Sequence, residues 1–138
     1  MFHTLAYFAT VFHRDFTAYT SVRLQKLGLS FGLLFPLIYV GKHPGCTQGE
    51  LTAALGLDWG YSQRSIAKLA DEGFISREKD GRAYHLELKE KGMEAFQLSH
   101  RVFSDWDSER LAVLEPEERQ QLLALLEKVR KSRVKSEI

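Results

Sequence analysis

The sequence has little cysteine, little proline and almost no net charge, and each shortage excludes a class of protein. A single cysteine excludes an internal disulfide and agrees with a reducing compartment. No apolar run is long enough to cross a membrane, and no positively charged segment precedes the first apolar residues as in a signal peptide. We therefore expect a cytoplasmic protein with no membrane contact.

The sequence also lacks any sign of a domain boundary. Its three prolines are scattered, and no repeat, low-complexity run or composition break divides the 138 residues. A chain of this length has room for one domain with a modest core. We predict a single domain over residues 1–138.

The arrangements of residues that enzymes use are missing as well. There is no Gly-rich phosphate loop, and the acidic residues are spread along amphipathic segments. We expect no enzyme activity and no cofactor. The five histidines are dispersed: His3, His13, His43, His85 and His100.

His43 and Cys46 are the only pair close enough in sequence to suggest a metal. Two ligands fall short of the four that a zinc site normally has, so we expect no metal site. Cys46 is also a candidate oxidant sensor, but its position near a helix start favours a small packing residue.

The formal net charge of +1 gives no overall attraction to an acidic partner. A protein that binds DNA must neutralise phosphates, so any positive potential has to come from where the charges are placed. The clear basic cluster lies near the C-terminus, where a solvated chain end is the more ordinary interpretation. It consists of Lys128, Arg130, Lys131, Arg133 and Lys135.

A helix, a sharp turn and a second helix are predicted from residue 47 onward. Thr47 and Glu50 have the spacing of a capping box, so a helix begins there. Gly56 falls where that helix must stop and reverse, which favours a residue that tolerates positive φ. Asp58 is a suitable N-cap for a second helix, which we expect to run from about Trp59 to Glu72.

The second helix has the two faces that a recognition helix requires. Ser62, Ile66 and Leu69 follow helical spacing and should face the core. For an isolated amphipathic helix, a merely solvated polar face would be the better interpretation, but the flanking elements favour DNA binding. The side chains expected on the other sides are Trp59, Tyr61, Gln63, Arg64 and Lys68.

Individual roles follow from base chemistry. Arg forks onto the two acceptors of guanine and Gln onto adenine, so Gln63 and Arg64 are the natural base readers, with Tyr61 close by. Lys68, further along the helix, suits a phosphate.

A basic β-hairpin is predicted after this helix. Residues 83–88 alternate as in a half-buried strand. The Asp80-Gly81 pair predicts a two-residue type I′ turn, flanked by Lys79 and Arg82. A basic hairpin tip fits the minor groove, although a solvated turn is the alternative. The order of elements is that of a winged helix-turn-helix, with double-stranded DNA as the partner.

These residues, taken in order and with their spacing, resemble the MarR family of bacterial and archaeal transcriptional regulators over roughly the whole chain. The resemblance implies a mainly α fold with a small β wing: a winged helix-turn-helix region at 29–92 and dimerisation helices at 1–28 and 93–138. The matching residues are Leu29-Ser30, Pro44-Gly45-Cys46-Thr47-Gln48-x-Glu50-Leu51, Leu55-Gly56-Leu57-Asp58, Arg64, Leu69, Gly73-Phe74-Ile75, Asp80-x-Arg82 and Leu88-x-x-x-Gly92.

The chain departs from the family pattern at several positions. Ser62 replaces a small apolar residue, and Gly60 weakens the first turn of the recognition helix by about 1 kcal/mol relative to Ala. The wing that carries Arg82 is short, and Lys89 replaces the Thr that usually caps the next helix. Pro36 falls inside the expected second helix, which predicts a kink or a shifted helix.

Apolar stripes at both ends of the chain predict a homodimer. A small winged domain cannot cover all this surface, and the resemblance implies the same two-fold dimer. Two-fold symmetry in turn predicts a palindromic operator. Pro116 should begin the last helix, where no amide bond is lost. The stripes contain Phe2, Leu5, Ala9, Phe12, Phe16 and Tyr19, then Met93, Phe96, Phe103 and Trp106, and finally Leu122, Leu123, Leu125, Leu126 and Val129.

The resemblance further implies a small-molecule effector pocket between the dimerisation helices and the winged region. Aromatic side chains that would line it are Phe16, Tyr19, Tyr39 and Trp106. Aromatics at helical spacing more often serve ordinary packing, which is the alternative for each of them.

Together these observations predict a sequence-specific, ligand-responsive repressor that binds a palindromic operator as a homodimer. A winged-helix module that binds protein and not DNA is the main alternative, because the charge is neutral and the wing is short. A metal- or redox-responsive regulator is a further one. The expected DNA-binding residues are Trp59, Gly60, Tyr61, Gln63, Arg64, Lys68, Lys79 and Arg82.

Overall fold

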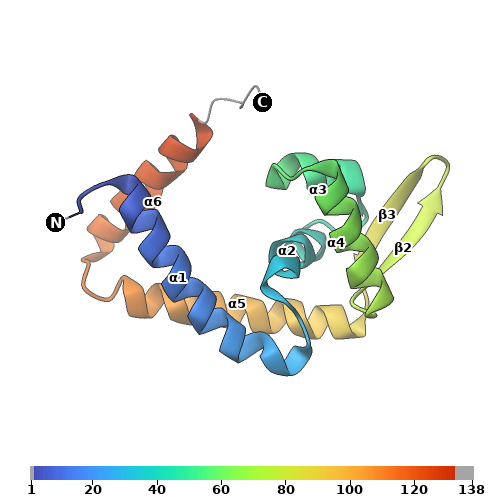
Figure 1. Ribbon diagram of the computed structural model, residues 1–138, viewed down its shortest axis with the longest axis horizontal. Helices are drawn as coiled ribbons and strands as arrows, with labels where there is room; N and C mark the ends of the chain where they lie inside the picture. Colours follow the sequence, from blue (N-terminus) through green and yellow to red (C-terminus); the bar gives the residue numbers. More distant parts are fainter. Residues whose placement is uncertain (1, 133–138) are drawn as a thin grey trace. The chain divides into compact units, whose positions relative to one another are not determined.

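The computed structural model describes residues 2–132, which are mostly helical with one small sheet (Figure 1). The chain forms two compact units, residues 1–103 and 104–138, and the expectation of a single domain stays a prediction. The elements are α1 (Leu5–Leu24), η1 (Gln25–Leu27), η2 (Phe31–Leu33), α2 (Leu34–Lys42), β1 (Cys46–Thr47), α3 (Gln48–Leu55), α4 (Trp59–Asp71), β2 (Ile75–Asp80), β3 (Ala83–Leu88), α5 (Glu90–Arg110) and α6 (Pro116–Lys131).

The core of the first unit lies among α2, α3, α4 and the sheet. Ser62, Ile66 and Leu69 of α4 are fully buried there, as their spacing predicted. Each large apolar side chain removed from water in this way contributes about 1.5–3 kcal/mol to folding. The largest fully buried apolar side chains are Phe74, Leu34, Leu37, Leu51, Ile66, Leu69, Ile75, Leu86 and Val40.

The predicted helix starts and stops between α3 and α4 are confirmed. The Glu50 amide donates to Thr47 Oγ1 at 3.1 Å, and the Thr47 amide donates to Glu50 Oε1 at 3.2 Å, which completes the capping box. Gly56 takes φ of +63° at the end of α3. The Asp58 carboxylate accepts from the Tyr61 amide at 3.1 Å and caps α4.

Pro36 does not kink a helix, because the helix starts late. A 3-10 helix, η2, precedes it, and α2 begins at Leu34, so Pro36 lies in the first turn. The first amides of a helix have no intrahelical partner, and a proline there loses nothing. Of the two outcomes that the sequence left open, the shifted helix is the one observed.

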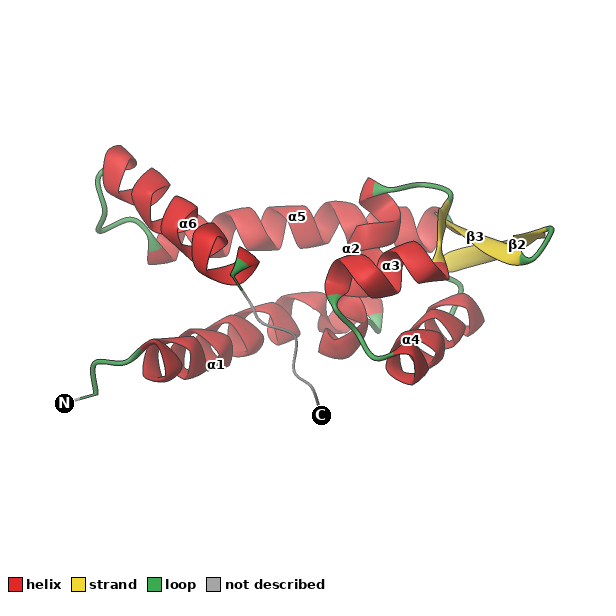
Figure 2. Ribbon diagram, turned by 90° about the horizontal axis from the view of Figure 1, so that it is seen from above, coloured by secondary structure: helices red, strands yellow, loops and turns green. Residues whose placement is uncertain are grey.

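The wing belongs to a three-stranded antiparallel sheet in the order β1-β3-β2. The sequence predicted the β2–β3 hairpin but missed β1, whose Cys46 pairs with Leu86. Figure 2 shows the hairpin reaching away from the helices around it.

The predicted position of the hairpin turn was wrong by one residue. Asp80 pairs with Ala83, so Gly81 and Arg82 are the two central residues of the turn, and Asp80 ends its strand. Of these two residues, only Gly81 has a positive φ, +66°. This is the pattern of a type II′ turn and not of type I′. Arg82 therefore lies in the turn itself.

In the second unit, α6 begins as its sequence predicts. Pro116 is its first residue, and the Glu115 amide donates to Glu118 Oε1 at 2.9 Å in a capping box. Lys128, Arg130 and Lys131 lie in its last turn, whereas the other two members of the basic cluster, residues 133 and 135, fall outside the described residues.

Among the described residues, no single helix is both long and apolar enough to cross a membrane. One bent pair, Leu5–Leu27 with Phe31–Lys42, meets the length and composition requirements across an 88° bend.

Candidate nucleic-acid interface

Helix α4 buries one side and exposes the other. Ser62, Ser65, Ile66 and Leu69 form its buried side. The five side chains that the sequence assigned to the other sides are all exposed, and they are Trp59, Tyr61, Gln63, Arg64 and Lys68. The structure thus brings four donor-bearing side chains and an indole onto the accessible surface of one helix.

Gly60 leaves room for an arginine over the first turn of α4. A Cβ atom at Gly60 would lie 3.2 Å from Asp58 Oδ2 and 3.3 Å from Arg64 Nη1. Side chains on a helix lean towards its N-terminus, and here the Arg64 guanidinium reaches back to that turn. The glycine that costs helix propensity therefore gives space to a predicted base reader.

A buried hydroxyl pair joins α3 to α4 and explains the unusual Ser62. The Thr52 hydroxyl donates to the Gln48 carbonyl at 2.7 Å, so it accepts from the Ser62 hydroxyl, 2.6 Å away. Ser62 is fully buried, and a polar group in that position needs such a partner. The serine thus adds a polar contact between the two helices where an apolar side chain would only pack.

Tyr61 also makes a contact outside its own helix. Its hydroxyl donates to the Gly32 carbonyl of η2 at 3.2 Å, although the side chain is 40% exposed. The ring borders a groove of about 340 Å³ whose other walls come from η2, α2 and the α3–α4 corner. The phenol therefore lies against the protein and is not fully free in solvent.

The two faces of the wing carry opposite charge. Arg77 and Lys79 alternate along β2, and both approach the ring of Tyr84, at 5.7 and 5.9 Å from its centroid. These three residues form the cationic face of the wing. The sequence analysis missed Arg77 and Tyr84 as partners of Lys79, although the two-residue period of the strands would have grouped them.

The opposite face of the wing is acidic. It holds Glu78, Asp80 and Glu87, together with His85. His85 Nδ1 lies 2.8 Å from the Gly45 carbonyl, and its Nε2 lies 4.0 Å from Asp80 Oδ2. This imidazole fixes the hairpin to the segment before β1.

Cys46 is buried and unreactive in character. It is 5% exposed, and burial, helped by the charge of Glu50, raises the pKa of its thiol to about 11. Burial also raises the pKa of the Tyr39 phenol nearby. Within residues 2–132, no three His, Cys, Asp or Glu side chains come together as a metal site.

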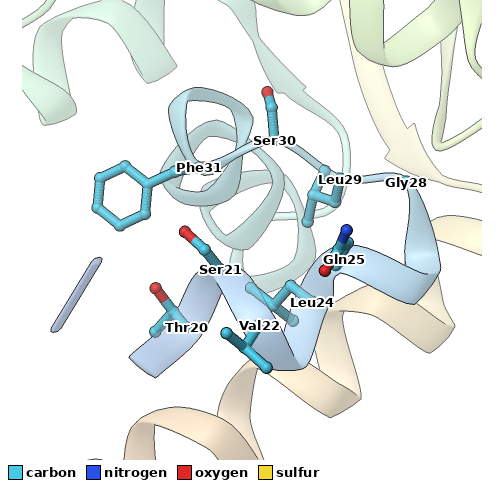
Figure 3. A pocket seen from close by; sticks show the side chains of 9 residues that line it. All are labelled: Thr20, Ser21, Val22, Leu24, Gln25, Gly28, Leu29, Ser30 and Phe31. Carbon is cyan, nitrogen blue, oxygen red and sulfur yellow. The ribbon is translucent and has the colours of Figure 1, made fainter. Parts of the chain in front are cut away.

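A cleft of about 520 Å³ lies where the end of α1 turns back towards η2 (Figure 3). Ser30 and Phe31 form one wall, and the last turn of α1 forms the other. Its lining residues are Thr20, Ser21, Val22, Leu24, Gln25, Gly28, Leu29, Ser30 and Phe31.

The four aromatics predicted to line an effector pocket do not line this cleft. Phe16 packs against the rings of Phe31 and Phe103, at 5.8 and 5.1 Å. The others are engaged elsewhere: Tyr19 lies under the Arg23 guanidinium at 3.4 Å, Tyr39 stacks on His43 at 4.2 Å, and Trp106 belongs to the second unit.

Two helices joined at a glycine corner and followed by a projecting hairpin define a winged helix-turn-helix protein. Comparisons with known proteins agree. The family model for the MarR family matches residues 37–83. The HTH-type transcriptional regulator BilQ of Clostridium symbiosum (strain WAL-14163) is 46% identical over 136 residues, which are 96% of this chain and 94% of that protein. The chain belongs to the MarR family of transcriptional regulators.

Solved structures show the same fold. A MarR transcriptional regulator from Methanosarcina mazei Go1 aligns with a TM-score of 0.84 at 24% identity, over 92% of this chain and 87% of that one. A putative MarR family regulator from Listeria monocytogenes, complexed with a 26mer DNA, aligns with a TM-score of 0.86 at 21% identity, over 94% and 89% of the two chains.

Proposed function

We propose that this protein binds a specific DNA sequence through α4 and the wing, and represses transcription as a homodimer. The observation that carries the proposal is the two-sided α4. Its buried side is fixed in the core, and its exposed side presents Gln63, Arg64 and Lys68 beside a hairpin with a cationic face. A rigid helix with exposed hydrogen-bond donors is what the major groove admits and reads.

Each exposed side chain of α4 has a proposed role. Gln63 and Arg64 read base edges in the major groove, and Lys68 holds a phosphate. Trp59, Gly60 and Tyr61 form the end of the helix that approaches the duplex.

The wing supplies the second contact. Arg82, at the turn, enters the minor groove, where the negative potential attracts a guanidinium. Lys79 and Arg77 lie along the same hairpin, on the face shared with Tyr84. This face brings positive charge to the phosphates, although the chain as a whole has almost no net charge.

Uncovered apolar side chains support a homodimer. On α6, Leu122, Leu125, Leu126 and Val129 recur at three- and four-residue spacing, and between 38% and 57% of each is exposed. The start of the chain exposes a further set: Phe2, Leu5, Tyr7, Phe8 and Phe12. Such surface needs a partner, and a second copy gives a two-fold assembly with a palindromic operator.

The cleft at the end of α1 supports control by a small-molecule effector. It lies between a helix with exposed apolar side chains and the segment that leads into the winged region. An effector that binds there would release the repressor by favouring a form with a different separation of the two α4 helices.

The proposal is tested by binding of the purified protein to duplex from the region upstream of its own gene. Random duplex of the same length is the control, and both are measured across a salt series. We expect tight binding that is selective for the upstream duplex and weakens steeply as salt rises. Absence of binding to either duplex at low salt would favour the protein-interaction module.

A further inference from the structure

We propose that Tyr61 is a positioning residue whose hydroxyl ties the recognition helix to η2 and so sets how α4 meets DNA. This inference rests on the DNA-binding function proposed above. It concerns the hydroxyl group and not the exposed edge of the ring. The tie joins two residues that are 29 positions apart in the sequence.

The geometry places the hydroxyl at the point where α4 can be anchored. Tyr61 is the third residue of α4, and its hydroxyl reaches the Gly32 carbonyl at 3.2 Å. The other side-chain bonds at this end stay inside the helix pair: Asp58 caps α4 itself, and Ser62 bonds to Thr52 of α3. The described bond from Tyr61 is the one that leads from the start of α4 to η2.

Gly32 forms a seat for this hydroxyl. A Cβ atom at Gly32 would lie 3.1 Å from the Tyr61 hydroxyl oxygen, closer than ordinary van der Waals contact. Gly32 has no positive φ, so its backbone does not require glycine. What the missing side chain provides is room for the phenol.

The seat is continuous with the cleft described above. Ser30 and Phe31 line that cleft and directly precede Gly32 (Figure 3). A displacement of this segment would move the acceptor of the Tyr61 hydrogen bond. The tie therefore connects the wall of the cleft to the end of α4 that approaches DNA.

Two substitutions disturb the same contact from opposite sides. Tyr61→Phe removes the hydroxyl and keeps the ring, and Gly32→Ala presses a methyl group on the hydroxyl without changing α4. We expect each to lower the ratio of affinities for specific and random duplex by about two- to tenfold, the range for loss of one hydrogen bond. The double variant should be no worse than Tyr61→Phe, because the atom that the methyl would meet is gone.

Tyr39→Phe is the matched control. It removes a phenol hydroxyl from α2, where the ring stacks on His43, and should leave the ratio unchanged. The melting temperature of every variant is measured alongside. A purely structural role would lower the melting temperature and leave the ratio as it is, which would overturn the proposal.

Other outcomes overturn it as clearly. If Tyr61→Phe lowers the ratio while Gly32→Ala does not, the hydroxyl contacts DNA itself. If the double variant shows the full product of the two single effects, the two residues act independently. Either result would refute the proposal that the Tyr61 hydroxyl acts through its bond to Gly32.

A measurement without DNA separates this inference from the proposed function. Amide hydrogen exchange of residues 59–65 should be faster in both single variants than in the wild-type protein. In the Tyr39→Phe control it should equal the wild-type rate. If the wild-type protein shows no selective DNA binding, the proposed function fails, and exchange still decides the tie. Unchanged exchange in both variants would refute it.

Discussion

The winged region and helix α6 differ in how far their apolar side chains are buried. Among the described residues, every buried apolar side chain lies between Leu24 and Val102. Helix α6 buries none, although it carries five large apolar side chains. The winged region shares its core with Leu24 of α1 and with Ala95 and Val102 of α5, whereas α6 has no buried side chain.

This difference separates the part of the sequence whose apolar side chains are buried within one chain from the part whose apolar side chains stay exposed. In the winged region, the starts of α3 and α4 have side-chain caps, and the buried hydroxyl of Ser62 has an acceptor in Thr52. In α6, the capping box and the Pro116 start specify the helix, but none of its described residues is buried. The exposed apolar side of α6 is therefore the surface on which the proposed homodimer can be tested.

The largest effect should come from placing charged side chains on the exposed apolar side of α6. Leu125→Asp combined with Leu126→Asp should weaken the proposed dimer by about 3 kcal/mol or more, roughly a hundredfold in dissociation constant, since two leucines lose burial and two carboxylates would be desolvated. Sedimentation equilibrium measures the change. Val113→Asp, at a turn residue that is 88% exposed, is the control. An unchanged dimer in the double variant would show that α6 is not the interface.

A substitution that disturbs the packing of the winged region should destabilise the protein whether or not it forms the proposed dimer. A methyl group at Gly92 would lie 2.0 Å from the Phe74 carbonyl oxygen, so Gly92→Ala should lower the free energy of unfolding by about 1–3 kcal/mol or more. Gly49→Ala, where the nearest atom is 3.8 Å away, should be neutral or slightly stabilising. Denaturant titration compares the two. Equal effects would contradict the close packing of α5 at Gly92 against Phe74, the residue before β2.

We expect the winged region alone to determine DNA selectivity. Arg64→Ala should reduce discrimination between specific and random duplex by about 1–3 kcal/mol, because a bidentate base contact is lost. Lys68→Ala should weaken both duplexes alike, because phosphates are the same in every sequence. Equilibrium binding to both duplexes separates the two roles. The same loss on both duplexes in Arg64→Ala would contradict base reading.

The last effect concerns Cys46 in the core and is confined to alkaline pH. Its pKa is raised from 9.0 to about 11 in the folded chain, so the folded form holds its proton at higher pH. Its contribution to stability should be full below about pH 9 and be lost as the pH rises through 11, with a slope of at most about 1.4 kcal/mol per pH unit. Urea titrations from pH 8 to 11 measure this slope. Cys46→Ala should remove that component, and an identical pH profile would contradict the raised pKa.

The local signals in the sequence were strong enough to predict most of the fold. The capping box at Thr47, the reversal at Gly56 and the cap at Asp58 depend on neighbours three or four residues away, and all three are observed. The faces of α4 followed from the helical period. The two-residue strand β1 was missed because only its pairing with β3 defines it.

The errors came where a local signal had two solutions. Asp80-Gly81 is a good turn pair, but Gly81-Arg82 also fits a two-residue turn, and pairing of Ile75 with Leu88 fixes the register that is observed. The bond from Tyr61 to Gly32 has no local signal at all, because it joins residues that only the folded chain brings together.

The acidic face of the wing has a consequence for how the proposed DNA site would be found. Glu78, Asp80 and Glu87 repel phosphates, so a hairpin approaching the duplex by that face would be turned away, and the wing has one favourable orientation. The same carboxylates limit attraction to DNA of arbitrary sequence, of which a genome offers an enormous excess. For the proposed function, weak general attraction leaves more of the protein free to find its specific site, so that correct base contacts, and not charge alone, decide where it binds.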